Sequence, residues 1–421
     1  MKQGGIGKFY FGWNIVLICS MITLLTVGTR MGIGPFFKPI LDDMEMSRTS
    51  LSFVVAISML AYGLGMPLAG KLVDRHGTRF VLLAGIAIVL FSIVWTVFTR
   101  NVLAFTLAYG ILLSVGLSFT SPVAMTPLVS RWFTRQRGKA LFYLSTGSMG
   151  GIAIMTPVFS YSIHMIGWRS TLLLLAAVFV LLLVPAVLYV IRDDAPEGTD
   201  QLPDQSVKAR KSQEALITPI QTWTQALSTR TFWQISFGLF VCGFSMNLLG
   251  SHGVPMLTDH GFSNATASFG IGLIGVVAML STVLLGELSD HLSRKHMLAL
   301  IYAVRGLGFL SLVLIMTPGQ LYIVSMIGGL VWAGSTALSS AILGDVYGVR
   351  WVGVLYGWGY FIHQIGGAVG SFLAGWGYES FGTHIISFGM AAILLGLASI
   401  VSLQLPSKWH VKTLISQQKN A

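Results

Sequence analysis

Charged residues are scarce in this sequence. Of its 421 residues, 26 are Lys or Arg and 15 are Asp or Glu, so charged residues make up 10% of the chain, whereas hydrophobic residues make up 54%. Soluble domains carry about 25% charged residues. The composition therefore excludes an ordinary soluble domain and indicates a protein that crosses a membrane several times.

Signatures of enzymes and of metal sites are also missing from the sequence. The two cysteines, Cys19 and Cys242, both lie in apolar runs, where we expect them to pack as small hydrophobic residues rather than form a disulfide. The sequence contains no cluster with metal-ligand spacing, no nucleophile elbow and no phosphate-binding loop. We therefore expect neither an enzyme nor a protein with a bound cofactor or metal.

Long apolar runs are what the sequence has instead. A transmembrane helix needs about 20 consecutive apolar residues, so the sequence predicts an all-α membrane protein with twelve transmembrane helices. They are expected at residues 11–37, 51–70, 80–98, 102–128, 140–162, 171–191, 232–257, 265–286, 297–316, 319–343, 352–376 and 384–405. The longest polar stretch, 193–230, follows the sixth helix. We interpret it as a cytoplasmic linker between an N-terminal six-helix bundle, 1–192, and a C-terminal one, 231–421.

Basic residues are distributed unevenly between the two sides of this predicted bundle. Loops on the side of the termini hold 20 Lys or Arg residues, and loops on the other side hold four, namely Lys38, Arg48, Arg100 and Arg169. Cytoplasmic loops carry the excess of Lys and Arg in membrane proteins. We therefore predict a protein of the inner cell membrane with both termini in the cytoplasm. The same distribution explains the net charge of +11 without nucleic acid as a partner.

The two predicted bundles resemble each other in sequence. The segment "SFVVAISMLAYGLGMPLAGKLVDRHGTR", which begins at Ser52, aligns without a gap with "SFGIGLIGVVAMLSTVLLGELSDHLSRK", which begins at Ser268, at an offset of 216 residues. Asp74 falls on Asp290 at this offset. Two six-helix halves in parallel repeat are the plan of transporters that work by alternating access, with the substrate site between the halves.

The aligned segments end in a motif that carries a family resemblance. "GKLVDRHGTR" (Gly70 to Arg79) resembles the loop motif of the major facilitator superfamily, and "GELSDHLSRK" (Gly286 to Lys295) is similar to its degenerate second copy. The resemblance implies that superfamily's twelve-helix fold and a gate at the cytoplasmic side. Gly70 would permit close helix contact there, and the charged residues would form pairs that break when that side opens. The gating candidates are Gly70, Asp74, Arg75, Arg79, Asp290 and Arg294.

Further segments resemble one group within that superfamily. "YFGWNIV", "GPFFKPILDDMEMSRTSLS", "RWFTRQRGKALFYLSTGSMGG" and "FIHQIGGAVGSFLAGWGYESFGTH" are similar to bacterial monocarboxylate-transporter and oxalate/formate-antiporter-like proteins. Many members of that group grip a carboxylate with an arginine in helix eight. Here helix eight, "GIGLIGVVAMLSTVLLG", has no charged residue, so a cation that binds the substrate must come from another helix.

Two arginines lie inside the predicted helices, whereas the 15 acidic residues all fall at loops or helix ends. A buried cavity with cations and no carboxylates attracts anions, because a charge at low dielectric must be paired or solvated. Arg30 in helix one lies about 10 Å from the helix centre on the outer side, which suits a central cavity. Arg305 lies near the middle of helix nine, which the family resemblance places at the periphery. Snorkelling or a structural pair is the alternative role for both arginines.

Polar residues in two other helices are candidates for hydrogen bonds to the substrate. Asn247, Ser251 and His252 lie in "MNLLGSHGVP" of helix seven, where the flanking glycines and proline can break a helix and free backbone groups. Tyr360, His363 and Gln364 lie in "YFIHQIGG" of helix eleven, and Tyr143 is a candidate for an aromatic cavity wall. Hydrogen bonding between helices is the alternative role for such residues.

These observations predict a secondary active transporter of a small organic anion, a mono- or dicarboxylate, that works as a monomer in the lipid bilayer by alternating access. Coupling to protons or to anion exchange is a hypothesis, and a proton would be carried by His252, His363 or the carboxylate of the substrate. The alternative is an exporter or importer of a larger amphipathic solute, such as a drug or a siderophore. A membrane sensor is less consistent with the sequence, because a sensor more often carries an additional soluble domain.

Overall fold

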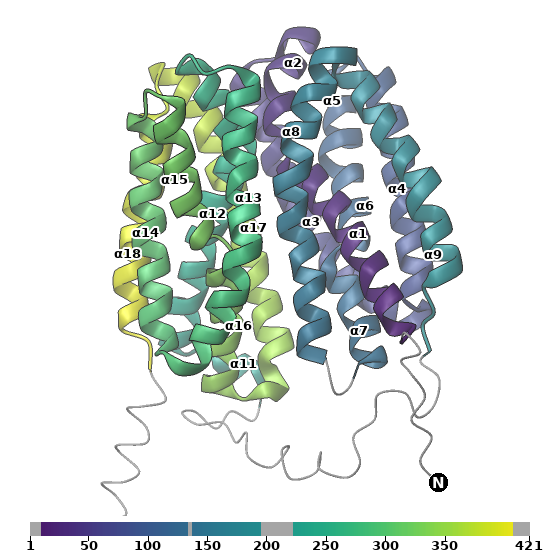
Figure 1. Cartoon of the computed structure of the whole chain (residues 1–421), viewed down its shortest axis with the longest axis vertical. Coiled ribbons are helices and arrows are strands. Elements are labelled where there is room, and N and C mark those ends of the chain that lie inside the picture. Colours follow the sequence, from purple (N-terminus) through teal and green to yellow (C-terminus); the bar gives the residue numbers. More distant parts are fainter. Residues whose placement is uncertain (1–9, 134–136, 195–221, 407–421) are drawn as a thin grey trace, which may run out of the picture.

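The computed structural model describes residues 10–133, 137–194 and 222–406, and long helices make up most of this part of the chain (Figure 1). The helices run between two ends of one bundle. The end that carries the helix α2 (Gly34–Met44) is called the α2 end below. The opposite end, which carries α7 (Pro122–Trp132), is called the α7 end.

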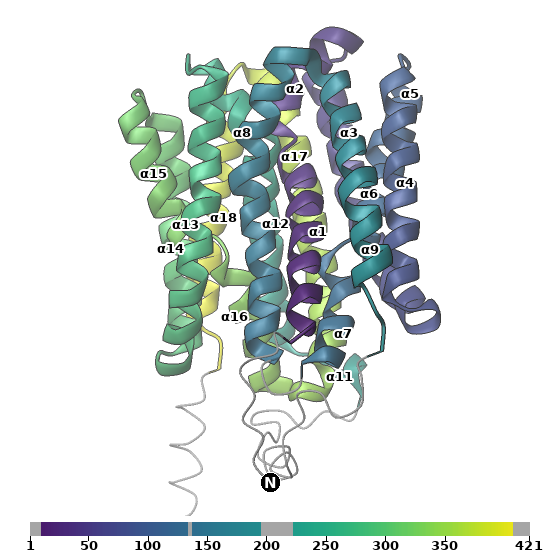
Figure 2. The same cartoon turned by 45° about the vertical axis from the view of Figure 1, so that its right-hand side comes forward.

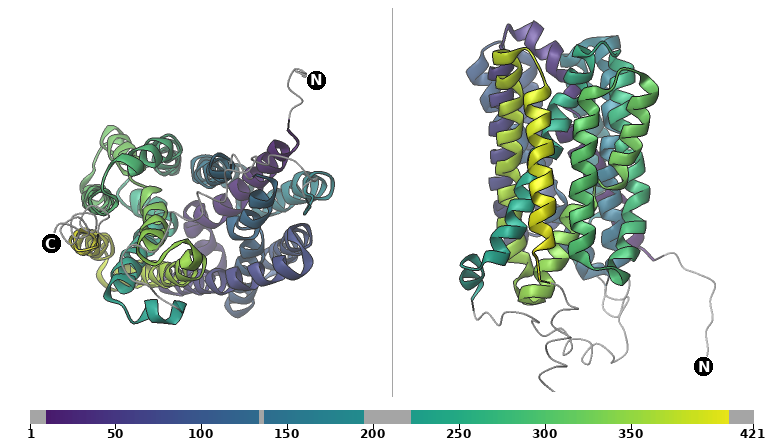
Figure 3. Two further views of the ribbon diagram at one scale, coloured as in Figure 1. Left: turned by 90° about the horizontal axis from the view of Figure 1, so that it is seen from below. Right: turned by 90° about the vertical axis from the view of Figure 1, so that its left-hand side faces the viewer.

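Two halves follow one another in the chain and lie side by side in the bundle (Figure 1, and seen from below in Figure 3). The first half contains α1 (Gly12–Met31), α2, α3 (Arg48–His76), α4 (Thr78–Phe98), α5 (Val102–Phe105), the π-helix η1 (Thr106–Leu112), α6 (Leu113–Phe119), α7, α8 (Arg137–Val178), the π-helix η2 (Phe179–Leu183) and α9 (Val184–Val190). The second half contains α11 (Trp223–Leu227), α12 (Arg230–Asp259), α13 (Asn264–His291), α14 (Arg294–Leu314), α15 (Pro318–Leu330), α16 (Gly334–Tyr347), α17 (Val349–Phe381) and α18 (Ile385–Leu403).

The helices account for the twelve predicted membrane crossings. Ten helical stretches of the described residues are long and apolar enough to cross a membrane. One of them, Tyr143–Val190, holds two crossings, because Gly167 at φ +78° interrupts it. α17 runs along the bundle against α3 and α12 and supplies the remaining crossing. The predicted all-α fold with two six-helix halves is therefore confirmed. Most of the predicted linker, 193–230, lies outside the described residues, and the division at that linker stays a prediction.

Three crossings are interrupted within their length. The first is divided between α1 and α2 at Gly32 and Ile33, the fourth between α6 and α7 at Thr120 and Ser121, and the tenth between α15 and α16 at 331–333. The seventh crossing, in contrast, is the continuous helix α12. The break that its glycines and proline suggested is absent, because Pro255 removes only one backbone hydrogen bond and the flanking residues are buried by neighbouring helices.

The halves touch most extensively along three pairs of helices. α3 packs against α17, α8 against α13, and α2 against α12. Figure 2 shows α8 beside α13, with α1 and α17 behind them. Glycines make the closest approaches possible: a Cβ on Gly375 of α17 would overlap Ser52 Oγ and lie 2.7 Å from the carbonyl oxygen of Arg48 in α3. The interface between the halves is therefore tightly packed near the α2 end.

Candidate functional site

Arg30, in the last turn of α1, lies where four helices from both halves meet. Its Nη2 donates hydrogen bonds to Gln364 Oε1 of α17 at 2.7 Å and to Asn247 Oδ1 of α12 at 3.1 Å. The same nitrogen lies 3.2 Å from Met59 Sδ of α3, and the guanidinium lies 4.2 Å from the centre of the Tyr62 ring. These five residues are called the Arg30 cluster below. The cluster joins α1 and α3 of the first half to α12 and α17 of the second.

Neutral groups make all of the recorded contacts of the Arg30 guanidinium within the described part of the chain. Arg30 Nε is buried and has no hydrogen-bond partner among the described residues, and the same holds for Gln364 Nε2. Both nitrogens are donors that lack an acceptor. A buried guanidinium is ordinarily paired with an anion, so the Arg30 cluster has a cation and two donors available for an oxyanion.

His363 and Tyr360 lie next to this cluster on α17. The two rings are stacked, with their centres 4.9 Å apart and an angle of 9° between their planes. His363 is buried, and neither of its ring nitrogens has a hydrogen-bond partner within the described residues. The structure thus brings together five of the predicted substrate-binding residues, namely Arg30, Asn247, Tyr360, His363 and Gln364.

Ser251 and His252 lie further along α12, toward the α2 end. His252 Nε2 is 2.9 Å from Ser52 Oγ of α3, and His252 Nδ1 is 2.8 Å from Ser251 Oγ. The His252 ring also lies against Phe37 of α2, at 4.6 Å between ring centres. In this conformation His252 therefore connects the two halves, and its predicted contact with substrate stays a prediction.

Arg305 of α14 is fully buried inside the second half. Its Nη2 donates to the carbonyl oxygens of Val331, at 2.9 Å, and of Trp332, and its Nη1 lies 3.3 Å from Cys242 Sγ. These carbonyls follow the end of α15, where a helix leaves its last carbonyl groups unpaired. A cation is favourable at such a helix end, so Arg305 stabilises the break in the tenth crossing. Its predicted contact with substrate stays a prediction.

Tyr143 of α8 lies apart from the Arg30 cluster. Its side chain is half-exposed, and its ring meets the Trp13 ring edge-on at 5.7 Å. Its backbone carbonyl accepts a hydrogen bond from Ser20 Oγ of α1 at 3.0 Å. These contacts place Tyr143 on the α1–α8 packing within the first half, and its predicted role as a cavity wall stays a prediction.

The loop motif lies at the α7 end, between α3 and α4. Asp74, Arg75 and Arg79 are exposed there. A Cβ on Gly70 would meet no atom of the described residues within 4 Å. The close helix contact expected at Gly70 is therefore not seen among the described residues in this conformation, and it stays a prediction.

The interactions recorded for the two motif copies among the described residues lie inside each half. In the first half, Asp193 accepts hydrogen bonds from the backbone N–H groups of Thr78, at 2.6 Å, and Arg79, at 3.3 Å, and so caps the start of α4. In the second half, Arg294 Nη1 forms an ion pair with Asp345 Oδ2 at 2.6 Å. The side chain of Asp290 lies outside the described residues. The gating role of these residues stays a prediction.

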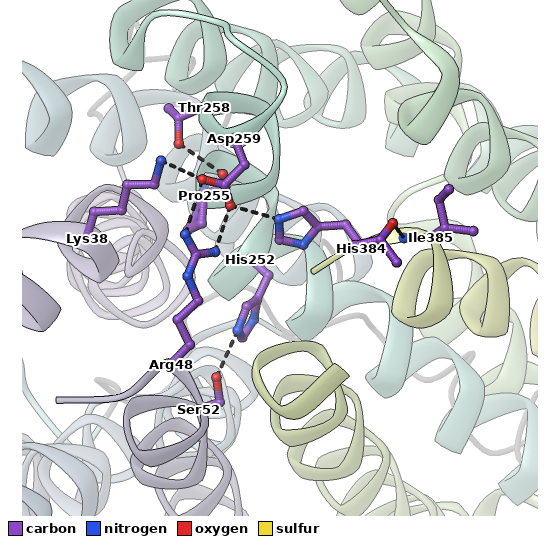
Figure 4. Close-up of polar contacts among 10 residues, drawn as sticks. Lys38, Arg48, Ser52, His252, Pro255, Thr258, Asp259, His384 and Ile385 are labelled. Carbon is purple, nitrogen blue, oxygen red and sulfur yellow. Dashed lines mark hydrogen bonds and ion pairs between the residues drawn. The ribbon is translucent and has the colours of Figure 1, made fainter. Parts of the chain in front are cut away.

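A cluster that the sequence did not reveal lies at the α2 end (Figure 4). The Asp259 carboxylate, at the end of α12, accepts hydrogen bonds from Lys38 Nζ of α2 at 2.7 Å and from both terminal nitrogens of Arg48 at 2.6 and 3.1 Å. His384 Nε2, just before α18, donates to the same carboxylate at 2.9 Å. We call these four residues the α2-end cluster. Lys38 and Arg48 belong to the first half, and Asp259 and His384 to the second, so the cluster ties the halves together.

The signal that points to this cluster is the scarcity of basic residues on the predicted outer side. Lys38 and Arg48 are two of only four Lys or Arg residues assigned to those loops. Side chains that go against the positive-inside rule are candidates for a specific role. The partner, Asp259, gives no such signal, because it is found only when the two halves are packed together.

Burial and neighbouring charges act on His384 in opposite directions. Burial, the largest effect, lowers the pKa of the imidazole below its ordinary value, and the Asp259 carboxylate raises it. The guanidinium of Arg48 lowers the pKa further, because a positive neighbour disfavours a second positive charge. The balance leaves the pKa of His384 lowered.

Comparisons with known proteins agree with this architecture. The family model described as Major Facilitator Superfamily matches residues 18–318 and 235–419. An uncharacterized MFS-type transporter, YcxA, of Bacillus subtilis is 25% identical over 93% of this chain and 94% of its own length. Monocarboxylate transporter 12 of Rattus norvegicus is 24% identical over 93% of this chain and 86% of its own length. The oxalate:formate antiporter of Oxalobacter formigenes is 22% identical over 92% of this chain and 91% of its own length.

A solved structure shares the fold. It is a bacterial homolog of the human lysosomal transporter Spinster in an inward-facing and unoccupied conformation. The match has a TM-score of 0.68 and 16% sequence identity, and it covers 94% of this chain and 99% of that chain. The predicted resemblance to the major facilitator superfamily and to its monocarboxylate-transporter and oxalate/formate-antiporter-like members is thus confirmed. The chain belongs to the major facilitator superfamily, and it is a transporter of that family rather than an enzyme.

Proposed function

We propose that this protein is a secondary transporter of a small organic anion, a carboxylate, which binds between the two halves at Arg30. The observation that carries the proposal is the Arg30 guanidinium at the junction of both halves, whose recorded contacts among the described residues are all neutral. A substrate that brings its own negative charge satisfies this cation. Arginine suits the task because its planar fork binds a carboxylate through two parallel hydrogen bonds.

The amide groups around Arg30 explain how the site changes on binding. In this conformation, the oxygens of Gln364 and Asn247 accept hydrogen bonds from Nη2 of the guanidinium. A carboxylate that takes this place displaces both oxygens. The Gln364 amide then turns its NH2 group toward the anion, so that its unpaired Nε2 gains an acceptor, whereas Asn247 Nδ2 keeps its hydrogen bond to the Gly243 carbonyl oxygen. A buried donor without a partner costs about 1–3 kcal/mol, and the anion removes this cost.

An apolar pocket beside α12, with room for about one water molecule in this conformation, would take an apolar part of the substrate only after it widens. The pocket is lined from both halves by Met31, Ile152, Met246, Leu249, Gly250, Ile271, Ile274 and Trp332. Met31 and Met246 are the chain neighbours of Arg30 and Asn247, so the polar cluster and the apolar pocket share α1 and α12. Relatives that are named monocarboxylate transporters are consistent with such a substrate.

We further propose that the protein is a monomer in the inner cell membrane. Its α7 end faces the cytoplasm, and both termini lie on that side. Arg75, Arg79 and Arg131 lie at helix ends there, as the positive-inside rule requires. The α2-end cluster then closes the outer side. Alternating access requires that Asp259 separate from Lys38 and Arg48 when the outer side opens.

A larger amphipathic solute, such as a drug or a siderophore, is the second candidate. The observation that favours it is the apolar lining that both halves give this pocket, which would have to widen greatly to hold such a solute. The two candidates differ in what Arg30 does, since an uncharged amphipathic solute gains little from a guanidinium.

Uptake into proteoliposomes tests the proposal. A panel of labelled mono- and dicarboxylates is compared with the corresponding amides, which have the same shape without the charge. We expect uptake of at least one carboxylate, no uptake of its amide, and loss of uptake in Arg30→Gln but not in Arg100→Gln, which removes an exposed arginine of a loop. Equal uptake of the acid and the amide, or full uptake by Arg30→Gln, would contradict the proposal.

A further inference from the structure

Each half has an acid–base pair at its α2 end. In the first half, Asp43 Oδ2 accepts hydrogen bonds from Arg169 Nε at 2.9 Å and from Nη2 at 2.7 Å. In the second half, Asp259 Oδ2 accepts a hydrogen bond from His384 Nε2 at 2.9 Å. In both pairs the acid follows the first crossing of its half, and the base stands at the start of the last.

The two pairs occupy equivalent positions of the internal repeat. Asp259 follows Asp43 by 216 residues, which is the offset that aligns the two halves in sequence. His384 follows Arg169 by 215 residues, and each base comes two residues after a glycine with positive φ, at +78° in the first half and +66° in the second. The repeat has therefore placed a histidine where the first half has an arginine.

This difference changes what the pair can do. A guanidinium stays charged at every accessible pH, whereas an imidazole changes its charge near pH 6.5. Asp43 consequently has a permanent cation in its own half. The corresponding base beside Asp259, His384, is not permanently charged. In this conformation two cations of the other half, Lys38 and Arg48, supply the positive charge to Asp259.

The second ring nitrogen of His384 is available for a proton. Because Nε2 carries the hydrogen that Asp259 accepts, Nδ1 of the neutral ring is an acceptor. Nδ1 is buried and has no hydrogen-bond partner among the described residues. A proton that adds to its lone pair yields an imidazolium, which remains hydrogen-bonded to Asp259 through Nε2.

Several charged and titratable groups face His384 from the surrounding helices. α12 contributes Asp259 and two histidines, His260 at 6.2 Å between ring centres and His252, and α17 contributes Tyr378, whose ring lies 4.3 Å away. The first half contributes Arg48 and Lys38, and the guanidinium of Arg48 lies 3.9 Å from the Tyr378 ring. When the α2 end is closed, a charged His384 would thus compete with Arg48 and Lys38 for the Asp259 carboxylate. It would also share the Tyr378 ring with Arg48.

We propose that His384 is a proton-binding site of the transport cycle: a proton on Nδ1 completes an ion pair with Asp259 inside the second half, which releases Arg48 and Lys38 and opens the α2 end. The protonated pair then matches the permanent pair of Asp43 and Arg169 in the first half. Each half is then neutralised within itself, and the two halves are free to separate.

The proton and the opening of the α2 end favour each other. In the closed state, burial lowers the pKa of His384 and the Arg48 charge lowers it further. When the halves separate, Arg48 leaves with the first half and water enters, so both effects weaken and the pKa of His384 rises. A state with a higher pKa is favoured as the pH falls, and the coupling is reciprocal.

Distances between spin labels across the α2 end test this inference. The label sites are Arg100→Cys, in the loop after α4, and Gly319→Cys, in the first turn of α15, and both residues are exposed at that end. The unsubstituted chain controls for labelling of the buried Cys19 and Cys242. No substrate is added, so the inference rests on the proposed alternating access but not on the identity of the anion.

A long distance between the two labels reports an open α2 end. For the otherwise native chain we expect the fraction of molecules with the long distance to grow as the pH falls from 7.5 to 5.5, by at most about tenfold per pH unit for one linked proton. His384→Gln, which keeps a donor but binds no proton, should show the short distance at both pH values. His384→Arg, which copies the first half, should show the long distance at both. His260→Gln, which removes an exposed neighbouring histidine, should keep the native response.

A native chain whose distances do not respond to pH would overturn the proton site, and so would an unchanged response in both His384 variants. If the distances respond as expected while no carboxylate is transported, the proton site stands and the proposed substrate fails. The two proposals therefore fail separately.

Discussion

Arg30 of the first half and Gln364 of the second are joined by a hydrogen bond of 2.7 Å between Nη2 and Oε1. This bond crosses the interface that must open and close during transport. It also places a neutral oxygen where a substrate carboxylate is proposed to bind, so the substrate must displace the Gln364 oxygen from the guanidinium.

Gln364→Glu places a carboxylate of the protein next to Arg30. We expect this variant to bind the substrate anion at least about tenfold more weakly, which corresponds to about 1.4 kcal/mol, because the internal carboxylate competes for the guanidinium. Its thermal midpoint in detergent should rise, since a buried cation gains a counter-ion. Substrate titration and scanning fluorimetry measure the two effects, and Gln404→Glu at the exposed α7 end is the matched control. Tighter anion binding by Gln364→Glu would contradict the account.

Asp259→Asn removes the negative charge and one of the two acceptor oxygens that the first half uses at the α2 end. Each hydrogen bond to a charged group contributes about 1.5–3 kcal/mol, so the balance should shift toward an open α2 end by about tenfold or more. The same spin-label pair reports this shift. Asp43→Asn, which breaks the equivalent pair inside one half, should lower stability without opening the α2 end. Equal opening in both variants would show that the pair between the halves has no special role.

Gly375→Ala tests the close packing of α3 against α17. The added Cβ would overlap Ser52 Oγ and approach the Arg48 carbonyl to 2.7 Å, so the closed interface is overpacked, at a cost of about 1–3 kcal/mol. We expect a larger open population and higher accessibility of the α2 end to a water-soluble thiol reagent at Ser52→Cys. Gly389→Ala, where a Cβ would meet no described atom within 4 Å, should behave as the native chain. A Gly375→Ala variant that labels no faster would argue against closure at this contact.

Arg305→Lys separates a structural role from a role in binding. Lysine has one nitrogen and so cannot keep both the carbonyl groups that Nη2 binds at the end of α15 and the Cys242 contact of Nη1. The thermal midpoint should therefore fall. The affinity for the anion in the folded fraction should remain within about twofold, because the recorded contacts of Arg305 all lie inside the second half. Weak anion binding at an unchanged thermal midpoint would instead place Arg305 in the site.

The fold follows from features that are local in the sequence. Apolar runs long enough to cross a bilayer, and a repeat at a constant offset, predict the helices and their division into halves. The interruption of a crossing is harder to predict, because it depends on which neighbours replace the lost backbone bonds. α12 remains continuous through Pro255, whereas the tenth crossing is interrupted and held by Arg305.

The candidate site could be predicted in part. Arg30 stands out because a charge inside an apolar run is costly, and Asn247, His363 and Gln364 stand out as polar residues in apolar helices. The α2-end cluster could not be predicted, because Lys38, Arg48, Asp259 and His384 lie at helix ends, where polar residues are ordinary. Only the packing of the two halves brings them together.

Equilibrium binding of a labelled carboxylate to the purified protein and to Arg30→Gln tests the central claim most directly. A carboxylate that is taken up by the native chain is used, and folding of the variant is checked by its thermal midpoint. The account predicts saturable binding to the native protein and at least about a hundredfold loss of affinity, or about 2.7 kcal/mol, in folded Arg30→Gln. Equal affinity in the two proteins would show that Arg30 does not bind the substrate.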